Sequence, residues 1–276
     1  MKTLILGAGG IGGYFGARLI QSGAAADFLV RPARAEVLRH NGLVLKSPLG
    51  DAHCPVNAVT SIAATPDTYG LVLLSCKAYD LDAAMDAIAP AVEGGAMVLP
   101  LLNGLAHLDR LDARFGRPAV LGGVAHISAT LAPDGTIHHL NTLHRIFAGA
   151  RDSTTADQAH ARLQVLADCG VAFTESPDIE ARMWDKWIFL ATLAAATSAL
   201  RASIGTILET THGKATVLGL LDECLAVAAT SGHQPEPAQL TTATRSPKPA
   251  PLSRPRCCAI SRAAGAPRAS MSSANS

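Results

Sequence analysis

A glycine-rich turn near the start of the chain constrains the fold more than any other feature. Residues 2–6 (KTLIL) predict a short apolar strand, GAGGIG follows at 7–12, and a helical pattern then runs to a stop at Gly23, with the next strand predicted at 27–30. The pattern alone also occurs in ordinary glycine-rich turns, but between two strands it lets a pyrophosphate approach the backbone at a helix N-terminus. We predict that a dinucleotide contacts Gly7, Ala8, Gly9, Gly10, Ile11 and Gly12.

The end of the second predicted strand indicates which dinucleotide binds. Sites specific for NAD place an Asp or Glu there to accept a hydrogen bond from the ribose 2′-hydroxyl, whereas this chain has Arg31 there and Arg34 three residues on. Cations at this place favour the additional 2′-phosphate of NADP. Two exposed arginines are also common on any protein surface, so NAD stays open as the alternative, with NADP (NADPH) favoured.

Three further apolar runs extend the strand pattern, at 71–75, 97–101 and 119–122, with a helical run between the first two. This alternation predicts an α/β fold whose N-terminal part is a Rossmann-type, doubly wound parallel sheet. Ligands of such sheets lie beyond the carboxyl ends of the strands. Lys77 and Asn103, which closely follow two of the strands, are therefore expected over the cofactor groove.

The pattern then turns from strands to helices. Residues 124–150 predict a β-hairpin with its turn at 133–135 (PDG), and its histidines have no metal-ligand spacing, so no metal is expected. Helices are predicted at 178–200 and 217–231, the first of them nearly uncharged beyond Lys186. Burial on an apolar helix lowers the pKa of a lysine and makes it a proton donor near neutrality, although a lysine at a helix edge also commonly extends to solvent.

Composition narrows the class of protein. The 276 residues are 49% hydrophobic with a formal charge of +1, and no long basic block precedes residue 241, which disfavours a nucleic-acid binder. The six cysteines form no CxxC pair, so neither a zinc site nor a disulfide framework is indicated. The N-terminal run is rich in glycine and soon reaches Arg18, which makes it a poor signal peptide or membrane span. We therefore expect a cytoplasmic protein that acts on a small molecule and binds neither nucleic acid nor membrane.

Four motifs occur in order along residues 1 to about 240, namely GAGGIGGYFGARL, SCKAYDL, LPLLNG and MWDKW. Together they resemble the ketopantoate reductase (2-dehydropantoate 2-reductase) family. The resemblance implies a Rossmann domain followed by an all-α domain, NADPH as hydride donor, and reduction of a 2-keto acid to a 2-hydroxy acid by a monomer or homodimer. The first expected substrate is ketopantoate, reduced to pantoate in pantothenate biosynthesis. We expect an NADP-binding domain at 1–170, a helical substrate or dimer domain at 171–240, and a separate tail at 241–276.

The resemblance also implies roles for single residues. Lys186 matches the family's catalytic lysine, which hydrogen-bonds the ketone oxygen and donates a proton as hydride reaches the carbonyl carbon. Asn103 and Lys186 would contact the substrate. The implied cofactor contacts are the glycine loop at the pyrophosphate, Arg31 at the 2′-phosphate, Lys77 and Asn103 at the nicotinamide side, and the backbone around His126 and Ile127.

The sequence departs from the family at its substrate positions. The best known members carry asparagines four, eight and eighteen residues after the lysine, where they bind the carboxylate and hydroxyl of the substrate, and this chain has Leu190, Ala194 and Ile204 there. Because buried hydrogen bonds set substrate discrimination, a more apolar 2-keto acid is the alternative substrate. A non-catalytic NADP(H)-binding protein is the alternative from a different class.

Residues 241–276 break the pattern of the chain before them. They hold six of the 23 basic residues and none of the 22 acidic ones, without periodicity, as a disordered basic tail would. However, the codons that can encode residues 256–276 also permit another peptide when they are read in a frame displaced by one nucleotide. That peptide contains Met-Leu-Arg-Asp-Ile-Glu and later Thr-Glu. It resembles the family's terminal segment, which carries a substrate-site Ser and Glu. We predict a one-nucleotide frameshift between about Leu240 and Ser246, which leaves the chain as written without that Ser and Glu.

Overall fold

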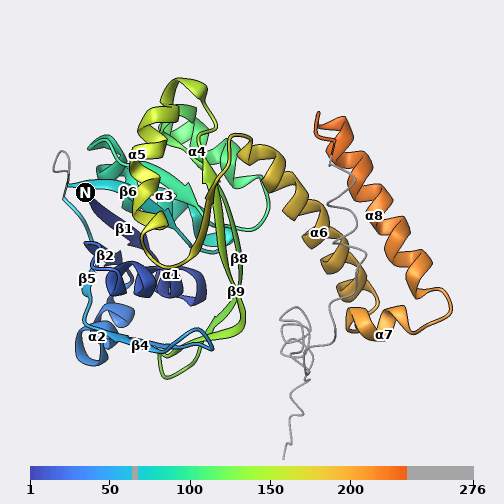
Figure 1. The fold of residues 1–276 in the computed structure, drawn as a ribbon, viewed down its shortest axis with the longest axis horizontal. Coiled ribbons are helices and arrows are strands. Elements are labelled where there is room, and N and C mark those ends of the chain that lie inside the picture. The colour runs from blue at the N-terminus through green and yellow to red at the C-terminus, as the bar shows by residue number, and fades with distance from the viewer. Residues whose placement is uncertain (64–67, 235–276) are drawn as a thin grey trace, which may run out of the picture. The chain divides into compact units, whose positions relative to one another are not determined.

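The structure, a computed structural model, describes residues 1–63 and 68–234 (Figure 1). It divides into two compact units, Met1–Met183 and a second that begins at Trp184. Strand β1 (Lys2–Leu6), helix α1 (Gly10–Gln21) and strand β2 (Ala26–Leu29) open the first unit and confirm the predicted start of the fold. The predicted frameshift and basic tail at 241–276 lie outside the described residues.

The first unit is built on a parallel sheet of five strands. In it β1 and β2 are joined by β5 (Asn57–Val59), β6 (Tyr69–Leu74) and β7 (Met97–Pro100), in the order β5-β2-β1-β6-β7. Leu6 lies opposite both Leu29 and Leu74, and Leu74 lies opposite Pro100, so the strands run in register. The carboxyl ends of β1, β2, β6 and β7 therefore meet at one edge, called here the carboxyl edge, as the Rossmann-type prediction requires.

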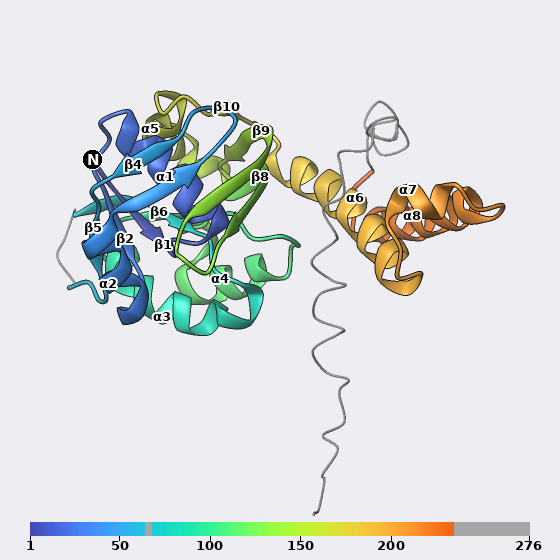
Figure 2. The same ribbon diagram turned by 90° about the horizontal axis from the view of Figure 1, so that it is seen from below.

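Side chains alternate between the two faces of this sheet. Ile5 and Leu73 belong to a core that includes α1, while their neighbours Leu4 and Val72 belong to a core formed with two other helices. Figure 2 shows these two helices on one side of the sheet and α1 on the other. They are α3 (Leu81–Glu93) and α4 (His107–Phe115).

The sequence predicts only the hairpin of a second, mixed sheet. Strands β8 (Gly122–Leu131) and β9 (Ile137–Gly149) form the predicted antiparallel pair. The run at 119–122 is not a strand as predicted, because a 3₁₀ turn at Arg117–Ala119 precedes a single bridge from Val120 to Val98 and then β8. Three short strands, which the sequence analysis does not predict, extend this sheet in the order β10-β9-β3-β4, namely β3 (Leu43–Lys46), β4 (Ala52–Cys54) and β10 (Ala172–Glu175). Helix α5 (Ala156–Ala167) packs on β9 and β10.

The second unit is helical in the part that the structure describes. Helix α6 (Ile179–Ala199) starts in the first unit and continues into the second, followed by α7 (Ile204–Leu208) and α8 (Gly213–Thr230). The helices predicted at 178–200 and 217–231 are thus confirmed. A small core of Ile188, Leu221 and Ala228 lies between α6 and α8. Among residues 1–63 and 68–234, no helix is long and apolar enough to cross a membrane.

A buried carboxylate ties together the amino ends of the parallel strands. Asp27 accepts hydrogen bonds from Tyr69 Oη at 2.7 Å and from Asn57 Nδ2 at 2.8 Å, and it pairs with Lys2 Nζ at 2.6 Å. Burial raises the pKa of Asp27, but these partners outweigh burial and hold the pKa below its usual value. Because the cluster lies at the strand ends opposite the carboxyl edge, it stabilises the sheet and takes no part in the candidate site.

Candidate functional site

The glycine loop connects β1 to α1 at the carboxyl edge. Gly7 has a φ of +93°, which glycine adopts readily, and its amide donates to the carbonyl of Leu29 at 3.0 Å, which fixes the loop to the end of β2. A Cβ at Gly12 would lie 2.2 Å from the carbonyl oxygen of Gly7. The loop can therefore be this tight only because glycine stands at both positions.

The N-terminus of α1 fits a phosphate group. Its N-cap residue is Gly9, no side chain caps the first amides, and the first turn holds no acidic residue. A Cβ placed on Gly9 would meet nothing within 4 Å, so the backbone is open to an approaching group. Amides at a helix N-terminus and the positive end of the helix dipole stabilise an anion. These features suit the pyrophosphate of a nicotinamide dinucleotide.

We expect Gly9→Ala to weaken cofactor binding by about tenfold or more, because its methyl group would enter the space through which the pyrophosphate approaches. The φ of −86° at Gly9 suits alanine, so the melting temperature should stay the same. Calorimetric titration with NADPH and with NADH measures the effect. Gly219→Ala on α8 is the control, since its new Cβ also meets nothing within 4 Å. Unchanged affinity in Gly9→Ala would show that this loop does not hold the pyrophosphate.

Two neighbouring segments support the glycine loop. The hydroxyl of Ser75, directly after β6, donates to the carbonyl of Leu6 at 2.9 Å. No role is predicted from the sequence for Ser75, although it is the first residue of the SCKAYDL motif. A Cβ on Gly10 would lie 2.5 Å from the carbonyl oxygen of Ala129, so β8 runs against the start of α1. The ladder of β8 with β9 shifts register between Ile127 and Ala129. Ile127, a predicted cofactor contact, lies two residues before Ala129 along the chain.

The other predicted cofactor residues of the first unit follow strands that end at the carboxyl edge. Arg31 is the N-cap of α2 (Pro32–Asn41) after β2, Lys77 is the N-cap of the 3₁₀ turn at Ala78–Asp80 after β6, and Asn103 follows β7. All three side chains are exposed. The parallel topology therefore brings these residues to the same edge as the glycine loop.

The two arginines after β2 have different contacts. Arg31 pairs with Asp80 through Nη2 and Oδ1 at 2.5 Å. Arg34 is half-buried and donates from Nη2 to the carbonyl of Ala8 at 3.2 Å, so it supports the glycine loop from α2. Asp80 is a residue that the sequence analysis does not assign, and only its place in the SCKAYDL motif could have pointed to it.

Lys186 lies on α6 in the second unit. Its side chain is half-buried, and desolvation lowers the pKa of its ammonium group to about 8. Leu190 and Ala194 follow four and eight residues later, which places all three on one face of the helix, and Ile204 begins α7. The face of α6 that carries Lys186 thus has apolar residues at the two following positions.

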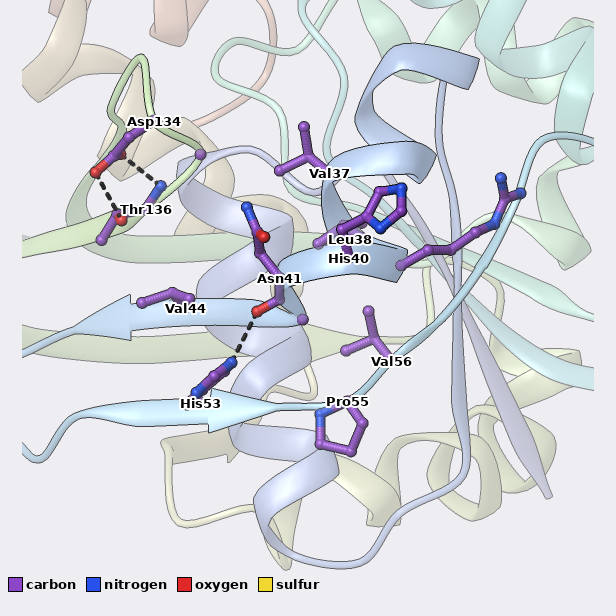
Figure 3. A pocket seen from close by; sticks show the side chains of 13 residues that line it. Val37, Leu38, His40, Asn41, Val44, His53, Pro55, Val56, Asp134 and Thr136 are labelled. Atoms are coloured by element: carbon purple, nitrogen blue, oxygen red, sulfur yellow. Dashed lines mark hydrogen bonds between the residues drawn. The ribbon is translucent and has the colours of Figure 1, made fainter.

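A separate hollow of about 810 Å³ lies in the first unit, lined by the end of α2, by β3 and β4, and by the hairpin turn (Figure 3). Two of its polar side chains are bonded within the fold, since His53 Nε2 donates to the carbonyl of Asn41 at 2.7 Å and Asp134 accepts from the amide of Thr136 at 2.9 Å. None of the residues that line this hollow is a predicted cofactor or substrate residue. We assign it no part in the site.

Two family models match the chain in order. The model described as ketopantoate reductase PanE/ApbA matches residues 3–153, and the model for the C-terminal part of the same family matches residues 178–254. The first match includes the glycine loop and the whole carboxyl edge. The second match includes Lys186.

Individual relatives agree with the family models. An uncharacterized oxidoreductase, YkpB of Bacillus subtilis, is 32% identical over 238 residues, which cover 86% of this chain and 78% of YkpB. A 2-dehydropantoate 2-reductase of Nostoc is 25% identical over 84% of this chain and 74% of its own length.

Solved structures show the same fold. A 2-dehydropantoate 2-reductase from Geobacter metallireducens superposes with a TM-score of 0.78 at 27% identity, covering 97% of this chain and 88% of that one. A D-mandelate dehydrogenase, solved with NADH and anilino(oxo)acetate, superposes with a TM-score of 0.83 at 20% identity, covering 94% of this chain and 84% of that one. At that identity the second likeness concerns the fold alone.

Proposed function

The chain belongs to the PanE/ApbA ketopantoate reductase family of oxidoreductases, and on this premise we propose that it reduces a 2-keto acid to a 2-hydroxy acid with NADPH as hydride donor. The observation that supports this best is the match to both family models in order, with the glycine loop in the first and Lys186 in the second. Ketopantoate, reduced to pantoate in pantothenate biosynthesis, is the first candidate substrate. We further propose a cytoplasmic monomer or homodimer.

The residues of the first unit would bind and orient the cofactor. The glycine loop would hold the pyrophosphate at the N-terminus of α1, and Arg31 would hold the 2′-phosphate. Lys77, Asn103 and the backbone of β8 near Ile127 would contact the nicotinamide side. When bound, the nicotinamide supplies the hydride.

Lys186 would supply the proton. Its Nζ donates a hydrogen bond to the ketone oxygen of the substrate, with Asn103 as a second substrate contact. A pKa of about 8 keeps the amine mainly protonated at neutral pH. Because this pKa is also close to neutral pH, the amine can transfer its proton efficiently. As the carbonyl carbon accepts hydride, the C=O π electrons move to the oxygen, which takes the proton from Lys186. The products are the 2-hydroxy acid, the oxidised dinucleotide and the neutral amine of Lys186.

A more apolar 2-keto acid is the second candidate substrate, because Leu190 and Ala194 follow Lys186 on its face of α6. Phenylglyoxylate, a 2-keto acid with an apolar phenyl side chain, serves as the apolar comparison substrate. We expect Leu190→Asn to raise kcat/KM for ketopantoate relative to phenylglyoxylate by about tenfold, since an added amide can form a hydrogen bond with a polar substrate. Keto-acid-dependent oxidation of NADPH measures both rates. The exposed neighbour Phe189→Asn is the control and should leave the ratio unchanged. An equal change of this kcat/KM ratio in both variants would show that Leu190 does not belong to the substrate site.

A further inference from the structure

Arg31 at the carboxyl edge is already paired with a carboxylate of the same chain. Its Nη2 lies 2.5 Å from Oδ1 of Asp80, and the two side chains are 78% and 30% exposed. Arg31 follows β2 and Asp80 follows β6, the strands on either side of β1. The pair therefore spans the strand that leads into the glycine loop, at the place where the adenosine ribose of a dinucleotide lies in this type of sheet.

The other cations at this edge do not replace Arg31. Arg34 is turned toward the glycine loop and donates to the carbonyl of Ala8 at 3.2 Å. Lys77 is exposed and begins the turn that carries Asp80. Arg31 is thus the exposed arginine after β2, and Asp80 offsets its charge.

The two reduced cofactors differ in what they require here. The 2′-phosphate of NADPH is a dianion near neutral pH, so it must compete with Asp80 for Arg31 and then lie beside a carboxylate of like charge. The 2′-hydroxyl of NADH carries no charge and can donate a hydrogen bond to a carboxylate. Asp80 therefore opposes the first cofactor and is compatible with the second.

We propose that Asp80 determines the cofactor preference of this protein by pairing with Arg31, so that the preference for NADPH is small and NADH is also accepted. The proposal rests on the nicotinamide site proposed above and deepens it. Arg31 is the group that attracts the 2′-phosphate, and Asp80 limits that attraction.

Dissociation constants of NADPH and NADH, measured by calorimetric titration of the 276-residue chain, test this proposal. We expect Asp80→Asn, which keeps the shape of the side chain and removes its charge, to tighten NADPH binding by about tenfold and to change NADH binding by less than about twofold. Arg31→Ala should weaken NADPH binding by about tenfold or more and leave NADH nearly unchanged. Asp82→Asn is the matched control, because Asp82 forms another exposed pair, with Arg110, and should leave both constants unchanged.

The outcomes separate the two proposals. If Asp80→Asn and Asp82→Asn give the same ratio of the two dissociation constants as the parent chain, Asp80 does not determine the preference and the inference is overturned, while the nicotinamide site stands. If neither cofactor binds the parent chain, the site itself is absent, and the proposed function fails together with the inference.

Discussion

Replacing Lys186 with alanine is expected to lower kcat for keto acid reduction by about 10²–10⁴-fold, the range typical for loss of a general acid. Cofactor affinity should stay within about twofold, because the glycine loop, Arg31 and the other predicted cofactor contacts belong to the first unit. The matched control is Lys214→Ala, which removes an exposed lysine on α8 of the same unit. Steady-state oxidation of NADPH gives kcat, and titration gives the affinity.

The pH dependence of kcat/KM, which reports ionisations of the free enzyme, tests the same role independently of the substitution. Burial lowers the pKa of Lys186 to about 8, and the amine must be protonated to donate. The value of kcat/KM should therefore be level below that pH and fall as the pH rises through it, with one proton involved. A kcat/KM that is level from neutral pH to well above 8, or a Lys186→Ala variant that keeps its turnover, would contradict a proton-donating role for this lysine.

Restoring the reading frame is expected to have the second large effect. The resemblance places a substrate-site Ser and Glu in the terminal segment that the present frame lacks, and loss of substrate-orienting groups typically lowers turnover by about 10²-fold or more. A gene corrected by one nucleotide between the codons for Leu240 and Ser246 should therefore give a far more active enzyme. Resequencing that region from independently prepared DNA shows whether the correction is the true sequence.

A matched control shows whether a gain in turnover comes from the restored segment or merely from loss of the present tail. A chain that stops after Leu240 lacks both segments and should be no more active than the chain as written. NADPH binding should be similar in all three chains, because the predicted cofactor residues lie before residue 130. Equal turnover in the restored and the present chain would refute the prediction that the restored terminal segment raises turnover.

The parts of the fold that the sequence predicts are those with strong local patterns. The β1–glycine loop–α1 unit is confirmed because an apolar strand, a run of glycines and a helical period follow one another without interruption. The sequence does not predict strands β4 and β5, because each has only three residues, Ala52–Cys54 and Asn57–Val59, which is too short for an alternating pattern. Such strands form because neighbouring strands supply their hydrogen bonds.

The sequence predicts which residues of the candidate site lie at the ends of strands, but not which side chains contact one another. Lys77 and Asn103 could be placed because topology alone brings the carboxyl ends of parallel strands to one edge. The pair of Arg31 with Asp80 joins residues 49 positions apart, and no local pattern couples them. Likewise, Lys186 could be singled out on its helix, whereas the lowering of its pKa depends on tertiary burial.

The most direct test of the account is to incubate the frame-restored chain with NADPH and a panel of 2-keto acids, including ketopantoate and phenylglyoxylate, and to identify the products by chromatography. We predict that one molecule of 2-hydroxy acid forms per NADPH oxidised with at least one of these substrates, and that Lys186→Ala slows its formation by about 10²–10⁴-fold. Binding of NADPH without oxidation by any member of the panel would contradict the account and would favour a cofactor-binding protein without catalytic activity.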